Sequence, residues 1–377
     1  MKYWRGYLTA AVFAAITWAL MQLGTKFTNL VDMIYPYVIR TAQTMLASWS
    51  GSVDFVLWQV LIVAAAVVAL ASLVLMVVLK WNPVQWFGWV LAVVSGVFML
   101  HTLFFGLNHY AGPMADDIRL EVVEYNLDEL TEAAIYYRDK ANALASQVNR
   151  DADGNVDFAE FKTLAEQAAD GFEAMVYDRS FPIFAGTTVP VKELGWADWY
   201  TDQGITGVTV GLTGESAVNP QIPDICLPFA ISHEMAHRMC IAGERDGNFA
   251  AFLTGAANES LEFQYSAYFM AYRFCYTMLA ASNDLDATGA AARVQNGVSD
   301  QLYQDLTHYN QFFSNTGSVG GVSTVDAEVC DLLVAWHIQE VVLPTITVVE
   351  DPFDPLDESQ VDLSGIVNAN TAEGGVG

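Results

Sequence analysis

The sequence has 377 residues, of which 53% are apolar, and a formal net charge of −27. This length permits two or three structural units, and the apolar share is high for a soluble protein. The strongly acidic balance disfavours nucleic acid and anionic lipid headgroups as partners of the polar part of the chain, and it repels acidic substrates.

The apolar residues are concentrated in three uncharged runs near the N-terminus, at about residues 6–25, 55–79 and 84–107. Each run is long enough to cross a bilayer as a helix. A basic start before an apolar run is also typical of a cleaved signal peptide, but no small-residue cleavage site ends the first run. We therefore expect a membrane domain, residues 1–107, with three retained transmembrane helices and the lipid bilayer as a partner.

The basic residues Lys2, Arg5 and Lys80 fall on one side of these spans. Since cytoplasmic loops carry the excess of Lys and Arg, that side is expected to be the cytoplasm. The sequence thus predicts a multi-pass protein of the cell membrane, with a cytoplasmic N-terminus and an extracytoplasmic domain. Residues 26–54, between the first two spans, predict an outer loop or an interfacial helix.

After the spans, the composition becomes that of an acidic globular domain, placed at residues 108–345, with an acidic disordered tail at 346–377. Residues 128–148 have helical spacing, with Asp128 as the expected cap. Residues 205–213 are rich in β-branched side chains and predict one strand or two short ones. The expected fold class is mainly α: three N-terminal transmembrane helices, then a mostly helical α+β domain with a small sheet.

Residues 149–160, NRDADGNVDFAE, match the twelve-residue calcium loop, with oxygen-bearing side chains and a turn glycine at the usual positions. The candidate ligands are Asn149, Asp151, Asp153, Asp157 and Glu160. Such loops usually occur in pairs and the sequence offers no second one, so the alternative is a capped acidic turn between two helices. Ca²⁺ is a candidate structural cofactor on this motif alone.

The motif with the most chemical content is His233-Glu234-Met235-Ala236-His237. On a helix, its two histidines project from one face and can reach one ion at about 2 Å from each nitrogen. Glu234 can take a proton from a water that the metal has acidified and pass it to a leaving amine. The alternative is a surface helix with an unrelated pair of histidines.

Catalytic zinc usually takes three protein ligands, so the two histidines need a partner. Glu244 is the best third ligand if the helix stops at Gly243 and the chain reverses, because an unbroken helix would carry Glu244 about 10 Å beyond His237. The fallback ligands are Asp246, Glu259 and Glu262.

Residues around the motif offer further roles. Tyr265 is the first candidate to stabilise the oxyanion that forms at a substrate carbonyl, with Tyr268, Arg273 and His308 as alternatives, although core packing explains each of them as well. The strand predicted at 205–213 precedes the helix that carries the histidine motif, and it could pair with an extended peptide.

Four cysteines follow the spans, an even number that suits two disulfide bridges or buried free thiols: Cys226, Cys240, Cys275 and Cys330.

The runs LPFAISHEMAH, GERDGNFAAFL and EFQYSAYFMAYR resemble a family of uncharacterised bacterial membrane proteins with three N-terminal spans and an extracytoplasmic zincin-like domain. FGLNHY, GLTGESAVNP and VCDLLVAWH resemble the same family in the same order. ERDGNFAAFL also resembles an element of soluble bacterial metallopeptidases, E-x-x-A-N-x-F-A-A, whose glutamate is the third zinc ligand; the resemblance thus supports Glu244. Here Cys240 stands where a glycine is usual, and Gly247 replaces an alanine.

Two functions are consistent with these features. The first is a membrane-anchored zinc metallopeptidase that hydrolyses a protein or peptide substrate, with Zn²⁺ on His233, His237 and Glu244 and with Glu234 as the general base. The alternative is a non-catalytic zinc-binding sensor or scaffold, in which the metal only fixes two helices. Glu234 favours the enzyme, because a structural site needs no base next to its ligand.

Overall fold

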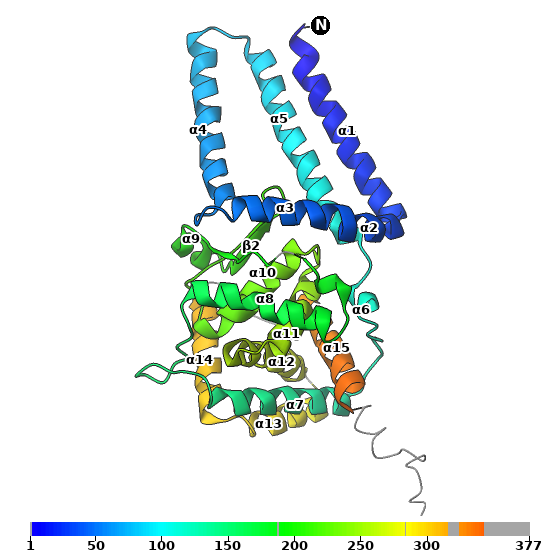
Figure 1. Cartoon of the computed structure of the whole chain (residues 1–377), viewed down its shortest axis with the longest axis vertical. Helices are drawn as coiled ribbons and strands as arrows, with labels where there is room; N and C mark the ends of the chain where they lie inside the picture. Colours follow the sequence, from blue (N-terminus) through cyan, green and yellow to red (C-terminus); the bar gives the residue numbers. More distant parts are fainter. Residues whose placement is uncertain (1, 187, 283, 316–323, 343–377) are drawn as a thin grey trace, which may run out of the picture. The chain divides into compact units, whose positions relative to one another are not determined.

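The computed structural model describes residues 2–186, 188–282, 284–315 and 324–342 (Figure 1). Residues 1–335 form one unit, and the residues described after it, 336–342, belong to a second. Helices predominate in the described part and its sheet is small, which confirms the mainly-α class. The predicted tail, 346–377, lies outside the described residues.

Within the described residues, three helices are long and apolar enough to cross a membrane: α1 (Arg5–Lys26), α4 (Leu57–Val78) and α5 (Pro83–Phe104). They confirm the three predicted runs to within a few residues at each end. α1 packs closely on α5, since a Cβ added at Gly6 would overlap the backbone of Gly88. The most apolar stretch of α4 is 0% buried, and the Trp86 indole N–H of α5 donates to the Ser72 hydroxyl of α4 at 3.3 Å. Three such helices indicate a multi-pass membrane protein.

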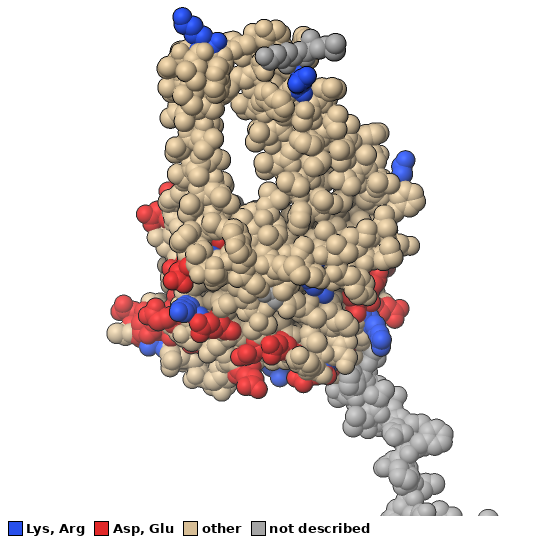
Figure 2. Space-filling view, turned by 45° about the horizontal axis from the view of Figure 1, so that its top comes forward, with Lys and Arg blue, Asp and Glu red and all other residues tan. Residues whose placement is uncertain are grey.

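Figure 1 shows the N-terminus and the α4–α5 connection at the end of the spans remote from the globular part. In the face drawn in Figure 2, the spans carry almost no charged side chains along their length, whereas acidic side chains gather over the globular part. The contrast is expected, because a charged group in the bilayer core has no water to solvate it.

Between α1 and α4, the chain runs across the ends of the spans as a helical segment, residues 28–50 (Figure 1). Its parts are α2 (Thr28–Ile34), the π-helical η2 (Tyr35–Ile39) and α3 (Arg40–Ser50). Buried side chains recur every fourth residue, at Val31, Tyr35, Ile39, Gln43 and Ala47. Large apolar side chains on the other face are exposed: Met33, Tyr37, Val38, Met45 and Trp49. Of the two alternatives predicted for residues 26–54, the chain adopts the helix, with an apolar outer face typical of a membrane interface.

The first half of the globular part is a series of helices that follows α5: η3 (Gly106–Tyr110), α6 (Met114–Asp117), α7 (Leu127–Ala145), α8 (Phe161–Tyr177), η4 (Pro182–Phe184) and α9 (Ala197–Asp202). The cap of α7 is Asn126, and the prediction of Asp128 is wrong by two residues. Asn126 accepts from the N–H groups of Asp128 and Glu129, while the Glu129 carboxylate accepts from the Asn126 N–H, as in a capping box.

The remaining helices begin with the short η5 (Asp224–Cys226) and continue as α10 (Leu227–Arg238), α11 (Glu244–Ala257), α12 (Leu261–Ala281), α13 (Leu285–Gln295), α14 (Asp300–Asn315), α15 (Thr324–His337) and the π-helical η6 (Ile338–Val342). α10 lies in the middle of the globular part, against α8, α11, α12 and the sheet. Ile231, Met235 and Ala236 of α10 are fully buried. The helix with the histidine motif is therefore a core helix, which excludes the surface-helix alternative.

The sheet has three strands in the order β1-β3-β2: β1 (Lys192–Glu193), β2 (Gly207–Val210) and β3 (Glu215–Val218). β1 is parallel to β3, and β2 is antiparallel to it. The predicted strand at 205–213 is β2, at the edge of the sheet, and it packs on α10.

The globular part is joined to the spans by a buried carboxylate. Glu215 of β3 accepts from the N–H groups of Leu57 and Trp58, at 2.8 and 3.0 Å, in the first turn of α4. Lys192 of β1 binds the same carboxylate at 2.7 Å. A negative charge at a helix N-terminus stabilises the exposed N–H groups there. The start of α4 is thus fixed by the sheet.

Candidate metal centre

The metal helix, α10, ends in a reversal that brings the next helix back to it. The Ile241 N–H donates to the Ala236 carbonyl and the Cys240 N–H to the His237 carbonyl, both at 3.1 Å. These are the two bonds of a Schellman motif, whose left-handed position is Cys240, with φ 68°. A glycine is usual there, and a side chain costs about 1 kcal/mol. Gly243 is instead the N-cap of α11, with φ −71°, so the prediction that Gly243 stops the helix is wrong.

The reversal gathers the three predicted ligands. Glu244 is the first residue of α11, and its carboxylate oxygens lie 3.3 Å from His233 Nε2 and 3.6 Å from His237 Nε2. In the part of the chain that the structure describes, these three residues are the group of His, Cys, Asp or Glu side chains whose ligand atoms lie within 4.8 Å of one another. Ligand atoms of a tetrahedral zinc ion are roughly 3.3 Å apart, and the two distances from Glu244 to the histidines lie close to this value.

The surroundings of the two imidazoles favour a ligand role. His237 Nδ1 lies 2.8 Å from the Ile241 carbonyl, which can only accept, so Nδ1 carries the proton and Nε2 is free to bind a metal. His233 Nδ1 is buried without a protein partner in the described residues. Gly247 of α11 leaves room for both rings, since a Cβ there would lie 3.0 Å from His233 and 3.1 Å from His237. The alanine that the resembling metallopeptidase element has at this position would crowd both imidazole rings.

The charges in the group act on one another. Hydrogen bonding to His233, and then to His237, holds the pKa of Glu244 well below its usual range. Burial lowers the pKa of His237, but its hydrogen bond to Glu244 and the charges of Glu234 and Glu244 together outweigh burial, so the pKa lies above the ordinary value. The Glu244 side chain is 64% exposed, which leaves one side of the group open to water or substrate.

Glu234 lies on the sheet side of α10 and is buried. Its carboxylate accepts a hydrogen bond of 2.6 Å from the Thr209 hydroxyl of β2. Gly207 of the same strand approaches so closely that a Cβ would lie 2.5 Å from Glu234 Oε1. The Ser216 hydroxyl donates to the Glu234 carbonyl at 2.7 Å. The edge of the sheet thus holds the carboxylate of the predicted base, whose charge acts on His237.

The fallback ligands lie elsewhere or have other partners. Asp246 pairs with Arg245 at 2.8 Å and accepts from the Met114 N–H. Glu262 accepts from the Ala159 N–H, and Glu259 is exposed. None of the three joins the ligand group.

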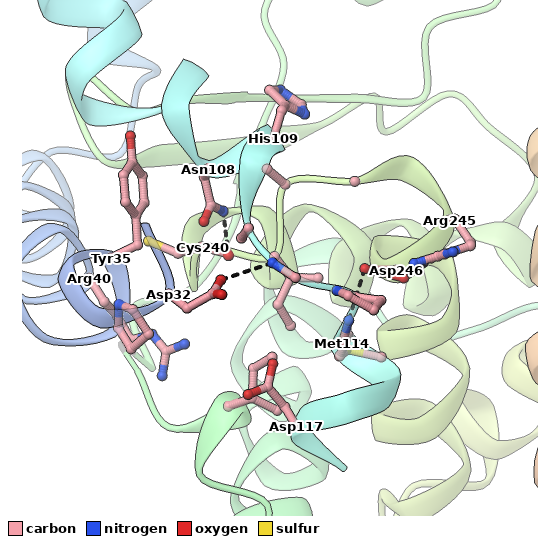
Figure 3. Close-up of a pocket in the computed structure, with 18 of the residues that line it drawn as sticks. Asp32, Tyr35, Arg40, Asn108, His109, Met114, Asp117, Cys240, Arg245 and Asp246 are labelled. Carbon is pink, nitrogen blue, oxygen red and sulfur yellow. Dashed lines mark hydrogen bonds and ion pairs between the residues drawn. The ribbon is translucent and has the colours of Figure 1, made fainter. Parts of the chain in front are cut away.

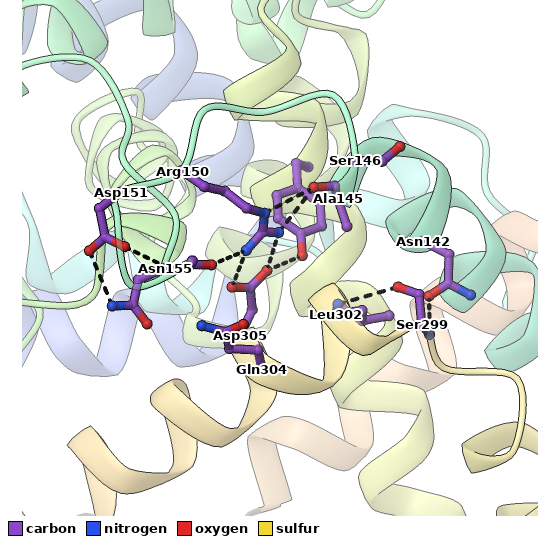
Figure 4. Close-up of polar contacts among 12 residues, drawn as sticks. Asn142, Ala145, Ser146, Arg150, Asp151, Asn155, Ser299, Leu302, Gln304 and Asp305 are labelled. Carbon is purple, nitrogen blue, oxygen red and sulfur yellow. Dashed lines mark hydrogen bonds and ion pairs between the residues drawn. The ribbon is translucent and has the colours of Figure 1, made fainter.

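Tyr265 belongs to a different cluster, that of Arg150 and Asp305, two residues labelled in Figure 4. Its side chain is fully buried, and its hydroxyl donates to Asp305 at 2.5 Å. Arg150 binds the same carboxylate through two bonds, at 2.8 and 2.9 Å. Since this hydroxyl already donates to a buried carboxylate, its contacts do not favour a role at a substrate oxyanion, and that role of Tyr265 stays a prediction. Of its alternatives, Tyr268 packs against the rings of Tyr137 and Phe252, and Arg273 pairs with Asp326.

The predicted calcium loop, residues 149–160, is a closed turn held to α14 through Arg150 and Asp305 (Figure 4). A bridge joins Arg150 to Val156, and the Asp151 carboxylate accepts from the N–H groups of Asp153 and Asn155. Among the described residues, the acids of the loop (Asp151, Asp153, Asp157 and Glu160) form no group of ligand distance. The geometry favours the capped-turn alternative, and calcium at these acids and Asn149 stays a prediction.

A pocket of about 1040 Å³ adjoins the metal group on the Glu244 side. Figure 3 shows Asp32, Tyr35 and Arg40 at one wall, and Arg245 and Asp246 at the other. The turn after α5 contributes Asn108 and His109. Partial burial and the nearby charge of His237 lower the pKa of His109, while Glu244 raises it, so His109 lies within electrostatic reach of the ligands.

Sequence reasoning missed several residues that build the centre. Thr209 and Gly207 were expected only as parts of a strand, and Phe105, which packs edge-on against His237 at 6.4 Å, was assigned to a span. Gly207 carried a signal: a glycine within a β-branched run marks a close approach of the backbone.

The described structure therefore defines a class: a multi-pass membrane protein whose globular part presents a His-His-Glu group that fits a metal ion. The chain belongs to the family described as "Protein of unknown function (DUF3810)", whose model matches residues 31–332. The resemblance to an uncharacterised membrane-protein family is confirmed in this respect, whereas a zincin-like relationship stays a prediction. No curated protein and no solved structure matches the chain.

Proposed function

We propose that the protein is a membrane-anchored zinc metallopeptidase. The observation that carries the proposal is the joint placement of four side chains: His233, His237 and Glu244 converge, and the buried Glu234 lies on α10 between the two histidines in sequence. A metal that only fixed α10 to α11 would need the three ligands but not a carboxylate held in place by Thr209.

In this mechanism, His233, His237 and Glu244 would hold the zinc ion. When bound, zinc supplies a Lewis acid that polarises a scissile carbonyl and lowers the pKa of water. Glu234 accepts a proton at its carboxylate and later donates it to the departing nitrogen. The Thr209 hydroxyl keeps that carboxylate in one orientation, so that the proton transfer begins from a fixed geometry.

The edge strand supplies a way to bind a peptide backbone. β2 pairs with β3 on one side only in the three-stranded sheet, so its other edge can pair with an extended segment. Gly207 brings this strand close to Glu234. A peptide paired with β2 would therefore pass the base.

We place the globular part outside the cytoplasm, because Lys2, Arg5 and Lys80 lie toward the opposite side of the spans. A substrate would then be a protein or peptide of the cell envelope or the exterior.

Digestion of a peptide library by the full-length protein tests the proposal. We compare the wild type with Glu234→Gln, which keeps the shape of the side chain but removes the base. The wild type should cleave a subset of peptides and the variant none, while both keep zinc. Cleavage by both forms would refute the role of Glu234. Zinc binding without cleavage by either form would favour the non-catalytic sensor or scaffold.

A further inference from the structure

The metal centre lies close to the ends of the membrane spans. Phe105 is the first residue after α5, and its ring centroid is 6.4 Å from that of His237. Arg40 of α3 donates from Nε to the Met239 carbonyl, at the end of the metal helix, at 3.0 Å. Asn108, three residues after Phe105, donates to the Cys240 carbonyl. Direct contacts thus fix the end of the metal helix to the span ends and to the helical segment 28–50.

The segment 28–50 marks the membrane surface. Its exposed apolar side chains include Tyr37, Met45 and Trp49, at 75%, 68% and 65%, whereas Gln43 on the opposite face donates to the Gly211 carbonyl at 3.0 Å, just past β2. Tyr and Trp favour the interface between lipid and water. With its apolar face toward lipid, the segment separates the bilayer from the metal centre by one helix diameter, about 10 Å.

The pocket connects the segment 28–50 with the metal centre. Its lining includes Tyr37 and Arg40 of the segment 28–50 and His109 beyond α5, and it also includes Glu244 of the ligand group. A chain that leaves the bilayer beside residues 28–50 can therefore reach Glu244 along the pocket. An extended peptide covers about 10 Å in roughly three residues.

We propose that the substrate is the juxtamembrane segment of a second membrane-anchored protein, which is cut within a few residues of its own span. This inference rests on the proposed peptidase function and names its substrate class. The geometry points to this class because one pocket is lined both by the segment 28–50 and by Glu244 of the ligand group. Confinement of both partners to one bilayer also raises the effective concentration of the segment at the site.

The test uses the full-length protein and single-span reporter proteins reconstituted together in phosphatidylcholine vesicles. Each reporter carries the same cleavable sequence at about 4, 12 or 30 residues from its span, which is about 13, 40 or 100 Å of extended chain. The free peptide is a fourth substrate. We expect the rate to be highest at the shortest spacing and to fall about 20-fold at the longest, as the −3/2 power of tether length requires.

Equal rates at all spacings, a highest rate at the longest spacing, or cleavage of the free peptide alone would overturn the inference and leave the peptidase standing. Absence of cleavage of every reporter and of every free peptide would overturn the proposed function, and the inference with it.

A pair of variants tests the route itself. Tyr37→Ala removes a pocket-lining side chain of the segment 28–50, and it should lower the ratio of short-tether to free-peptide cleavage. Met45→Ala is the matched control, because Met45 is similarly exposed on the same segment but does not line the pocket. Equal ratios for both variants would contradict the proposed route.

Discussion

The substitution Gly247→Ala tests whether α11 is placed to fit the two imidazoles. The added Cβ would lie 3.0 Å from His233 Cε1, 3.1 Å from His237 Cε1 and 3.2 Å from His233 Nδ1. Carbon atoms in contact prefer about 3.5–4.0 Å, so the rings or the helix must move by a few tenths of an ångström. Zinc–ligand distances tolerate only about 0.2 Å, and the movement exceeds that tolerance.

We expect Gly247→Ala to weaken zinc binding by about 10-fold or more, or at least about 1.4 kcal/mol. Alanine is also the better helix former by up to about 1 kcal/mol, so the metal-free protein should not unfold earlier merely because of the substitution. The assay is competition with a chelator on the full-length protein, together with thermal unfolding of the metal-free form.

Gly289→Ala is the matched control, because Gly289 lies in helix α13 and a Cβ there would meet nothing within 4 Å. It should stabilise the fold slightly and leave zinc affinity unchanged. The reasoning is refuted if Gly247→Ala binds zinc as tightly as Gly289→Ala does.

Three further changes have defined outcomes. Thr209→Val removes the hydroxyl that binds Glu234, and we expect kcat to fall about 10-fold, with zinc affinity unchanged; an unaltered kcat would show that Thr209 does not orient the base. Glu215→Ala leaves Lys192 without its buried carboxylate and α4 without its cap, which should lower the free energy of unfolding by about 3–5 kcal/mol. The control is Glu193→Ala, at the exposed residue after Lys192, which should change that free energy by less than about 0.5 kcal/mol. Similar losses in both variants would contradict the capping role. Protons compete with zinc for His237, and the pKa of His237 lies above the usual 6.5, so zinc affinity should begin to fall at a pH above 6.5 as the solution is acidified. A zinc affinity that stays unchanged down to pH 6.5 would contradict the raised pKa.

The sequence was sufficient for the spans, because uncharged runs of this length have few other structures open to them. It also predicted that His233, His237 and Glu244 lie together, while their role as metal ligands stays a prediction. The spacing of His233 and His237 placed both on one helical face, and the need for a third ligand led to Glu244. The position of the reversal was wrong, since Cys240 adopts a left-handed conformation that a non-glycine residue rarely takes.

The parts that could not be predicted depend on contacts between distant segments. Nothing near Tyr265 in sequence indicates that Asp305 and Arg150 bind around it, and Glu215 shows no sign of capping a span more than a hundred residues before it. The approach of Gly207 to Glu234 likewise requires the sheet to be placed against α10. Local periodicity identifies elements and faces, but it does not determine which faces meet.

The central claim is that two imidazoles and a carboxylate, joined by the reversal after α10, hold one metal ion. Zinc content of the full-length protein, measured after loading and exhaustive dialysis, tests it most directly. We expect one tightly held zinc per chain in the wild type and in Glu234→Gln, and loss of that zinc in Glu244→Ala. A wild type that retains no zinc, or a Glu244→Ala protein that retains it at full affinity, would contradict the account.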